Sequence, residues 1–153
     1  MTPEENLASL GLVLPSTSVP VATYVPFRFA GPFLFLSGQG PRQDDGTYRP
    51  GRLGLTATVE EGYADARRTG LQLLATAKAA LGELSRIQAV VKLLGMVNAE
   101  PDFCDHPKVI NGCSDLFVEV LGEAGRHARS AVGMGSLPNR MTVEIEVIFL
   151  VER

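Results

Sequence analysis

The spacing of apolar positions changes several times along the chain, and each spacing predicts a different element. Between residues 58 and 84, apolar or small side chains recur every three or four positions, which predicts an amphipathic helix. Thr58 and Glu61 have the spacing of a capping box, so we expect this helix to begin near Thr58. Its predicted buried stripe consists of Val59, Tyr63, Ala66, Gly70, Leu73, Ala77 and Leu81.

Two shorter helices follow from similar signals. One is expected from Thr2 to Gly11, with Pro3 in its first turn. The other begins after "AEPDF", with Asp105 as N-cap and Pro107 in the first turn, and stops at the glycines 122 and 125. Its predicted buried stripe consists of Val109, Cys113, Leu116 or Phe117, and Val120.

The remaining apolar runs predict strands. Residues 27–38 form two β-rich runs around a Gly-Pro turn, which indicates a hairpin, and residues 85–99 predict a mostly buried strand. From Met141 to Val151 every second residue is apolar, as in a strand with one buried face. "LPSTSVPVATYVP" is expected to be extended, and "QGPRQDDGTYRPGRLG" to be a long polar loop.

The resulting order, β-β-α-β-α-β-β, predicts an α+β fold with two helices gathered on one face of a mixed sheet. No repeat or linker divides the sequence, so we expect one domain over residues 1–153. The opposite face of such a sheet stays uncovered in a monomer. We therefore expect a homo-oligomer in which a second copy covers it.

Composition narrows the possible partners. The 153 residues are 45% hydrophobic, enough for one compact core, and the net charge is −3. An acidic chain without basic clusters disfavours nucleic acid as a partner. No apolar stretch approaches the roughly 20 residues of a membrane span, and the N-terminus lacks the features of a signal peptide. We therefore expect a cytoplasmic protein.

Cys104 and Cys113, with His106 between them, are most simply explained as small apolar residues in a reducing compartment. A zinc site would need four ligands with closer spacing, so the metal reading is weak. A Cys–His nucleophile pair stays open, although no local signature supports it. His127 is expected to lie in a loop just before a strand.

The C-terminal segment carries charges in a strand-like pattern. If its two strands form an antiparallel hairpin, Arg129 lies opposite Glu146 and Ala131 lies opposite Glu144, all on one face. A cross-strand ion pair there would contribute only ~0.2–1 kcal/mol. The alternative is a small-anion site, since the planar fork of arginine matches a carboxylate and a glutamate can position water. The residues alone leave both open.

Three segments resemble the RidA/YjgF family of imine deaminases, some of whose members are labelled endoribonuclease L-PSP. "ARSAVGMGSLPNRMTVEIEVI" is similar to the closing signature of the family, "LFLSGQGP" to its S-G-Q-x-P strand, and "VVKLLGMVNAEPDF" to its V-V-K stretch. The resemblance spans residues 24–152 and leaves residues 1–23 as an N-terminal extension. It implies a chorismate-mutase-like fold that forms a homotrimer, with sites in clefts between subunits.

The resemblance also implies roles for particular residues. Arg129 stands where the family arginine grips the substrate carboxylate, and Glu144 where the family glutamate orients the attacking water. The other expected substrate-binding residues are Tyr24, Ser37, Gly38, Asn111 and Ala131. The implied reaction is hydrolysis of a 2-imino or enamino acid to a 2-keto acid and ammonia, without a metal or organic cofactor.

Two departures from the family pattern suggest a divergent branch. Ala131 replaces the cysteine of many deaminating members, and Gly40 replaces a bulky apolar residue in S-G-Q-x-P. The loop at residues 44–54 is also longer. A non-catalytic binder of small carboxylates or keto acids is therefore a second hypothesis. Endoribonuclease activity is a third, disfavoured by the acidic charge and the lack of a basic face.

Overall fold

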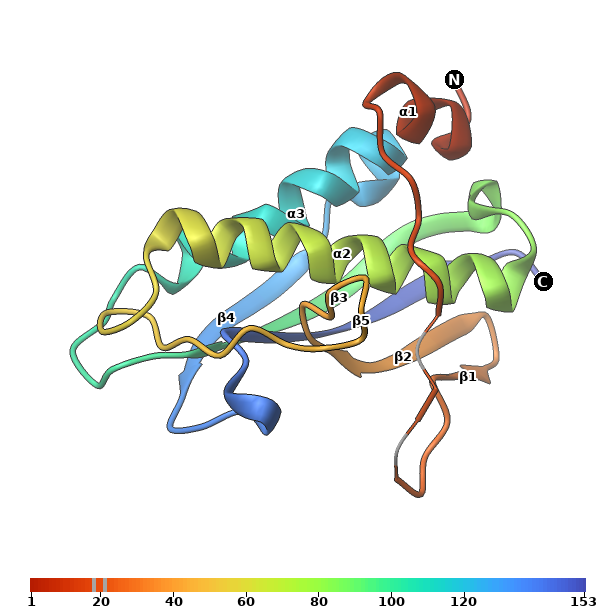
Figure 1. Ribbon diagram of the computed structural model, residues 1–153. Coiled ribbons are helices and arrows are strands. Elements are labelled where there is room, and N and C mark those ends of the chain that lie inside the picture. The colour runs from red at the N-terminus through yellow and green to blue at the C-terminus, as the bar shows by residue number, and fades with distance from the viewer. Residues whose placement is uncertain (18, 21) are drawn as a thin grey trace.

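The computed structural model describes residues 1–17, 19–20 and 22–153, and within these residues five strands form one mixed sheet. The strands are β1 (Phe27–Ala30), β2 (Phe33–Gln39), β3 (Ile87–Asn98), β4 (Ala128–Met134) and β5 (Val143–Val151). The helices are α1 (Pro3–Ser9), α2 (Val59–Leu81) and α3 (His106–Leu121), with short 3-10 turns η1 (Leu84–Arg86), η2 (Gly122–Gly125) and η3 (Pro138–Arg140). Helices α2 and α3 lie on one side of the sheet (Figure 1), which confirms the predicted α+β fold. Positions 18 and 21 of the predicted extended segment lie outside the described residues.

The helix starts follow the capping signals only in part. The Thr58 hydroxyl accepts a hydrogen bond from the Glu61 amide at 3.1 Å, and the Glu61 carboxylate accepts one from the Thr58 amide at 3.0 Å. Thr2 and Glu5 repeat this capping box at α1. Asp105 occupies the N-cap position of α3, but its side chain makes no capping bond. The predicted N-cap position of α3 is therefore confirmed.

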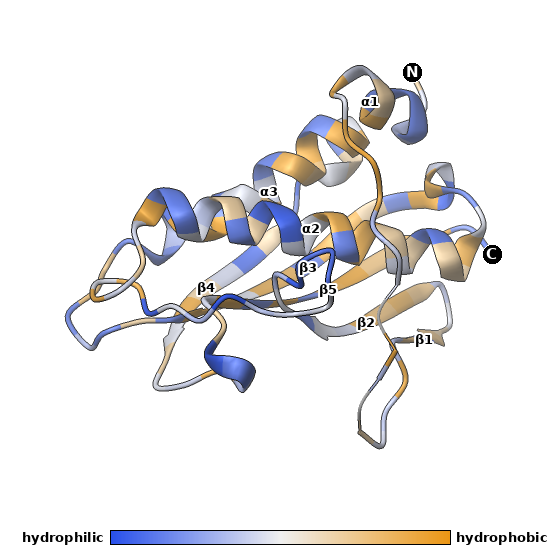
Figure 2. Ribbon diagram, in the orientation of Figure 1, coloured by the Kyte–Doolittle hydropathy of each residue, from blue (hydrophilic) through white to orange (hydrophobic). Residues whose placement is uncertain are grey.

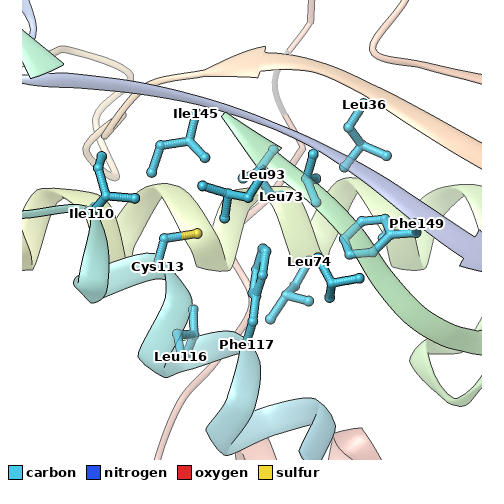
Figure 3. Close-up of a cluster of buried hydrophobic side chains, with 14 of the residues drawn as sticks. Leu36, Leu73, Leu74, Leu93, Ile110, Cys113, Leu116, Phe117, Ile145 and Phe149 are labelled. Carbon is cyan, nitrogen blue, oxygen red and sulfur yellow. The ribbon is translucent and has the colours of Figure 1, made fainter. Parts of the chain in front are cut away.

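The core lies between the two long helices and the sheet (Figure 3). Figure 2 shows the strands as mostly hydrophobic and the outward side of α2 as more hydrophilic. A Cβ at Gly112 would collide with the Tyr63 carbonyl, so this glycine permits the close approach of α3 to α2. The buried side chains shown in the close-up include Leu36, Leu73, Leu74, Leu93, Ile110, Cys113, Leu116, Phe117, Ile145 and Phe149.

The strand order corrects the predicted C-terminal hairpin. Strand β4 pairs with β3 in parallel, and β5 lies between β2 and β3, antiparallel to both. Strands β4 and β5 are therefore not neighbours, although they are consecutive in the sequence. The reason is that β3, α3 and β4 form a β-α-β crossover, which returns the chain parallel to its first strand. Strand β5, with one wholly apolar face, takes the central position.

This topology also determines on which side of the sheet Arg129 and Glu144 lie. Residues directly opposite one another on neighbouring strands point to the same side of a sheet. Arg129 lies opposite Leu93, which lies opposite Val147, and both apolar side chains are buried under the helices. Glu144 lies opposite Met96 on the other face. Arg129 and Glu144 therefore belong to opposite faces of one sheet, contrary to the prediction.

The two long helices leave the face that carries Glu144 uncovered (Figure 1). Large apolar side chains are 37–42% exposed there or along its edges, namely those of Phe33, Phe35, Val91 and Val132. Large apolar side chains gathered on one open surface are typical of a contact site. The predicted uncovered face is thus present.

The N-terminal extension is attached to the core. The Asn6 side-chain amide donates to the Val120 carbonyl at 2.9 Å, and Glu4 accepts from the Leu84 amide at 2.8 Å. Leu7 is 5% exposed and joins the core. After α1 the chain crosses over α2 toward β1 and β2 (Figure 1). The first part of the extension, residues 1–14, therefore packs against the helical layer.

Candidate functional site

Four of the predicted site residues meet in one cavity of about 330 Å³. Ser37 and Gly38 lie near the end of β2, Glu144 lies near the start of β5, and Tyr24 comes from the segment before β1. We call this group of Tyr24, Ser37, Gly38 and Glu144 the glutamate half. It places one carboxylate in a cavity with otherwise uncharged walls.

The Glu144 carboxylate lies against the backbone of β2. A Cβ on Gly38 would come within 2.7 Å of Glu144 Oε2, so a side chain at this position would force the carboxylate to shift. Burial raises the pKa of Glu144 above its usual value, and the neighbouring charge of Glu146 raises it further. No described residue hydrogen-bonds to this carboxylate, so its oxygens remain available to a water molecule.

Ser37 holds the chain segment that carries Tyr24. Its hydroxyl donates to the Val25 carbonyl at 2.6 Å, and its amide donates to the Pro26 carbonyl at 3.0 Å. Because both bonds bind the segment next to Tyr24, Ser37 positions the cavity wall. Tyr24 itself is 49% exposed.

Sequence analysis missed several residues of this cavity. Val19 and Pro20 come from the N-terminal extension, Tyr48 comes from the long loop, and Pro138 and Asn139 come from η3. The N-terminal extension and the longer loop, which both depart from the family pattern, therefore line the same cavity. These two departures were visible in the sequence, but the sequence alone did not show that the two segments meet.

Gly40, which stands where the family pattern has a bulky apolar residue, lies against Met141. A Cβ at Gly40 would overlap the Met141 sulfur, and both residues line the cavity of the glutamate half. Met141 is 4% exposed. Its thioether therefore fills the place that a side chain at position 40 would take, so the floor of the cavity is not left open.

A second group lies between α3 and β4, and we call Asn111, Ser114, His127 and Arg129 the arginine half. Arg129 Nη1 donates to Asn111 Oδ1 at 2.8 Å and to Ser114 Oγ at 3.0 Å. Its Nη2 donates to the Pro107 carbonyl at 3.3 Å. Among the described residues, Arg129 Nε has no hydrogen-bond partner. The guanidinium is thus fixed on one side and has donors left on the other, at a cavity of about 270 Å³.

His127 lies in the loop just before β4, as predicted, and its ring belongs to this half. Its Nε2 lies 2.8 Å from Ser114 Oγ, and its Nδ1 lies 2.6 Å from the Gly125 carbonyl. Burial lowers the pKa of His127 below its usual value. The hydrogen bond to Gly125 opposes this effect, and the charge of Arg129 adds to it. The imidazole is therefore neutral near pH 7.

One chain does not bring the two halves together. Arg129 and Ala131 share the helix side of the sheet, and Glu144 and Glu146 share the open side. Ala131 is half-buried against the core. The ion pair between Arg129 and Glu146, one of the two alternatives left open by the sequence, is excluded within one chain, because β3 separates the two strands and the residues face opposite ways.

The cysteines and other polar clusters do not extend this site. Cys113 is fully buried, which raises the pKa of its thiol, and Cys104 is exposed. Within the described ranges, no group of three or more His, Cys, Asp or Glu side chains is arranged to hold a metal ion. In the same part of the chain, no helix combines the length and apolarity needed to cross a membrane.

A wider hollow of about 1010 Å³ lies between residues 12–15, the 41–49 loop and α2. Each of the arginines in it is paired with a carboxylate: Arg49 with Glu61 and Asp65, Arg67 with Glu119, and Arg68 with Asp44. The positive charges there are already compensated. This hollow is therefore a weaker candidate for an anion site than the arginine half.

The fold, with a five-stranded mixed sheet and two long helices on one face, defines a chorismate-mutase-like α+β protein. Residues 4–149 match the family described as YjgF/chorismate mutase-like, putative endoribonuclease. The chain belongs to this family, as the resemblance to RidA/YjgF proteins predicted.

Individual relatives show where the chain lies within the family. It is 44% identical over 144 residues to Protein TCP17 of Trypanosoma cruzi, covering 94% of this chain and 90% of that protein. A structure called a putative endoribonuclease from Shewanella oneidensis MR-1 is 38% identical, with a TM-score of 0.94 and coverage of 99% and 100%. RidA from the Antarctic bacterium Psychrobacter sp. is 25% identical, with a TM-score of 0.62 and coverage of 89% and 94%. The contrast supports a divergent branch.

Proposed function

We propose that the protein hydrolyses 2-imino or enamino acids to 2-keto acids and ammonia. The observation that carries this proposal is the pair of complementary half-sites. One half presents an ordered guanidinium with remaining donors, and the other presents an unpaired carboxylate with a raised pKa. A carboxylate-bearing electrophile and a water molecule are the ligands that such a pair suits.

We further propose that the two halves meet between subunits of a homotrimer. The halves lie on opposite faces of the sheet, and the glutamate face exposes apolar side chains such as Phe35 and Val132. A second copy packed on that face would bury them and could bring its own edge strand β4 near Glu144. A cytoplasmic location remains a prediction.

The chemistry requires only the substrate, water and these side chains. Arg129 of one subunit binds the carboxylate of a protonated imine. Glu144 of another takes a proton from water as the oxygen bonds to the imine carbon and the C=N electron pair moves to nitrogen. The carboxyl then returns the proton to the amine nitrogen of this carbinolamine. The C–N bond breaks as the C=O bond forms, and the hydroxyl proton leaves with ammonia as ammonium.

The walls of the glutamate half favour an apolar substrate side chain. Apart from Glu144, the cavity is lined mainly by apolar, aromatic and small residues, including Tyr24, Tyr48 and Met141, and its volume is about 330 Å³. We propose that imines derived from bulky apolar amino acids are better substrates than those derived from acidic or basic ones. Ammonia release from imines generated by an amino acid oxidase would measure this order.

The decisive test uses two inactive variants, Arg129→Ala and Glu144→Gln, carrying different affinity tags and co-expressed. Random mixing leaves about one site in four with both intact residues, and purification through both tags raises this to one site in three, so about a third of wild-type turnover should return. Each variant alone should be inactive. Absence of recovery in doubly purified mixed trimers would contradict the intersubunit site, and wild type at the background rate would contradict the deaminase itself.

A second candidate is a binding protein for keto acids. Ala131 stands where many deaminating members have a cysteine, and this favours a site that retains the ligand contacts without catalysis. Thermal stabilisation by keto acids together with background imine hydrolysis would select it. Ribonuclease activity, named for the Shewanella relative, is disfavoured by the net charge of −3.

A further inference from the structure

Ser114 and His127 form a hydrogen-bonded pair directly behind Arg129, and the proposed reaction does not use them. Ser114 Oγ lies 2.8 Å from His127 Nε2 and 3.0 Å from Arg129 Nη1. His127 Nδ1 lies 2.6 Å from the Gly125 carbonyl. A chain of polar contacts therefore runs from the backbone at η2 through the imidazole and the hydroxyl to the guanidinium.

The direction of each hydrogen bond follows from what each group can donate. A carbonyl can only accept, so His127 Nδ1 carries a proton and donates to Gly125. In the neutral ring Nε2 is then bare, and it accepts the hydroxyl proton of Ser114. With its single proton engaged, the Ser114 oxygen can only accept from Arg129. The imidazole thus fixes the rotation of the hydroxyl.

This arrangement has a consequence for the guanidinium. Both hydrogens of Arg129 Nη1 are taken, one by Asn111 and one by Ser114. Nη2 donates one hydrogen to the Pro107 carbonyl. The donors that remain for a ligand are Nε–H and the second hydrogen of Nη2, where two parallel bonds to a carboxylate are possible. We infer that Ser114 and His127 are positioning residues that set the orientation of Arg129, so that its Nε and Nη2 edge binds the carboxylate.

This inference rests on the proposed function in one respect, namely that the ligand of Arg129 is a carboxylate. A nucleophilic role for Ser114 is the competing reading of the same pair. The hydrogen bond from the Arg129 cation withdraws electron density from the Ser114 oxygen, which disfavours attack. The other charged groups lining this cavity are Asp115, bonded to the Tyr63 hydroxyl, and Arg126, paired with Glu123.

The first test measures binding and turnover in Ser114→Ala, with Ser114→Thr as the variant that keeps the hydroxyl. Loss of one hydrogen bond should raise KM and the Kd for pyruvate about three- to tenfold, with kcat within about twofold. Ser114→Thr should restore both constants to within about twofold of wild type. His127→Phe should match Ser114→Ala, and His106→Gln should match wild type. Equal pyruvate Kd values for Ser114→Ala and wild type would overturn the inference.

The second test needs neither ligand nor activity. In ¹⁵N-labelled protein, the His127 ring signals should show a protonated Nδ1 and a hydrogen-bonded bare Nε2, and Ser114→Ala should shift the Nε2 signal. The Arg129 Nε–H proton should exchange with water faster in Ser114→Ala than in Ser114→Thr. An unchanged Nε2 signal, or acylation of Ser114 by p-nitrophenyl acetate, would overturn the positioning role. A wild type that neither binds pyruvate nor turns over imines would overturn only the proposed function.

Discussion

The two halves of the candidate site are built on opposite electrostatic plans. In the arginine half, Arg129 donates three hydrogen bonds to protein acceptors at 2.8–3.3 Å, so the cation is ordered before any ligand arrives. In the glutamate half, no described residue donates to the Glu144 carboxylate, and burial raises its pKa. The first plan suits binding, because orientation costs little when the ligand arrives. The second suits proton transfer, because a carboxylate with a raised pKa is a stronger base.

The difference also explains why neither half suffices alone. An ordered guanidinium without a base can hold an anion but cannot move a proton. An unpaired carboxylate without a cation nearby has no means of orienting an acidic substrate. Each region therefore makes its own prediction: removing Glu144 should abolish chemistry and spare binding, whereas removing Arg129 should weaken binding and chemistry together.

The largest effect is expected for Glu144→Gln, which keeps the shape of the side chain but removes the base. Turnover of imines should fall about 10²–10⁴-fold. The Kd for a keto acid, measured by calorimetry, should stay close to that of wild type, because the arginine half is intact. Glu146→Gln is the matched control and should retain most of the turnover. A Glu144→Gln protein with full turnover would exclude this carboxylate as the base.

The next effect is expected for Arg129→Ala, which should lower kcat/KM about 10²–10³-fold, since two charge-assisted hydrogen bonds to the carboxylate are lost. Unlike Glu144→Gln, it should also abolish detectable keto-acid binding. Arg129→Lys should fall in between, because an ammonium keeps the charge without the fork. Lys108→Ala removes an exposed cation at the start of α3, which pairs with Asp105, and should leave both constants unchanged. Tight keto-acid binding by Arg129→Ala would contradict the assignment.

The halves also differ in how far the sequence revealed them. The apolar residue at every second position of β5 predicted that Glu144 points away from the buried side, and helical periodicity predicted the buried stripe of α3. The neighbour of β4 could not be obtained in this way, because strand pairing depends on which non-local partner covers each edge. Ser114 and His127 were not singled out as a pair, since their contact exists only after η2 has returned the chain to β4. Local patterns therefore predicted elements and faces, and topology decided which residues meet.

A smaller effect, on stability, is expected from Gly40→Ala in the floor of the glutamate half. The new Cβ would overlap the Met141 sulfur, so the free energy of unfolding should fall by about 1–3 kcal/mol. At this chain length the Tm should fall by roughly 2–4 °C for each kcal/mol. Gly135→Ala is the control, because nothing lies within 4 Å of its Cβ position.

A double variant separates overlap from a general intolerance of Gly40→Ala. Met141→Ala alone should be destabilising, since it empties a buried position. Combined with Gly40→Ala, the loss of stability should be smaller than the sum of the two single losses, because the overlap is gone. Additive losses would show that Met141 does not fill the place of a side chain at position 40. Keto-acid binding by the arginine half should be unchanged throughout.

The smallest effect concerns pH, where only the glutamate half should respond near its carboxyl pKa. Glu144 must be ionised to accept a proton, so kcat should rise with pH, with an inflection above the usual glutamate pKa of 4.5. Glu146→Gln removes the second cause of the raised pKa and should move this inflection to lower pH.

The raised pKa of Glu144 also has a consequence for stability. Since the pKa of Glu144 is raised in the folded state, its contribution favours folding below the unfolded pKa, and this advantage is lost as pH rises through the folded pKa. At pH 8, Glu144→Gln should therefore have a higher Tm than wild type, by a few degrees at most. The difference is small because solvent screens this half-buried carboxylate, which costs less than about 1 kcal/mol of folding free energy. At pH 4 the two Tm values should converge, and a Tm difference that is the same at both pH values would show that the carboxyl is not perturbed by burial.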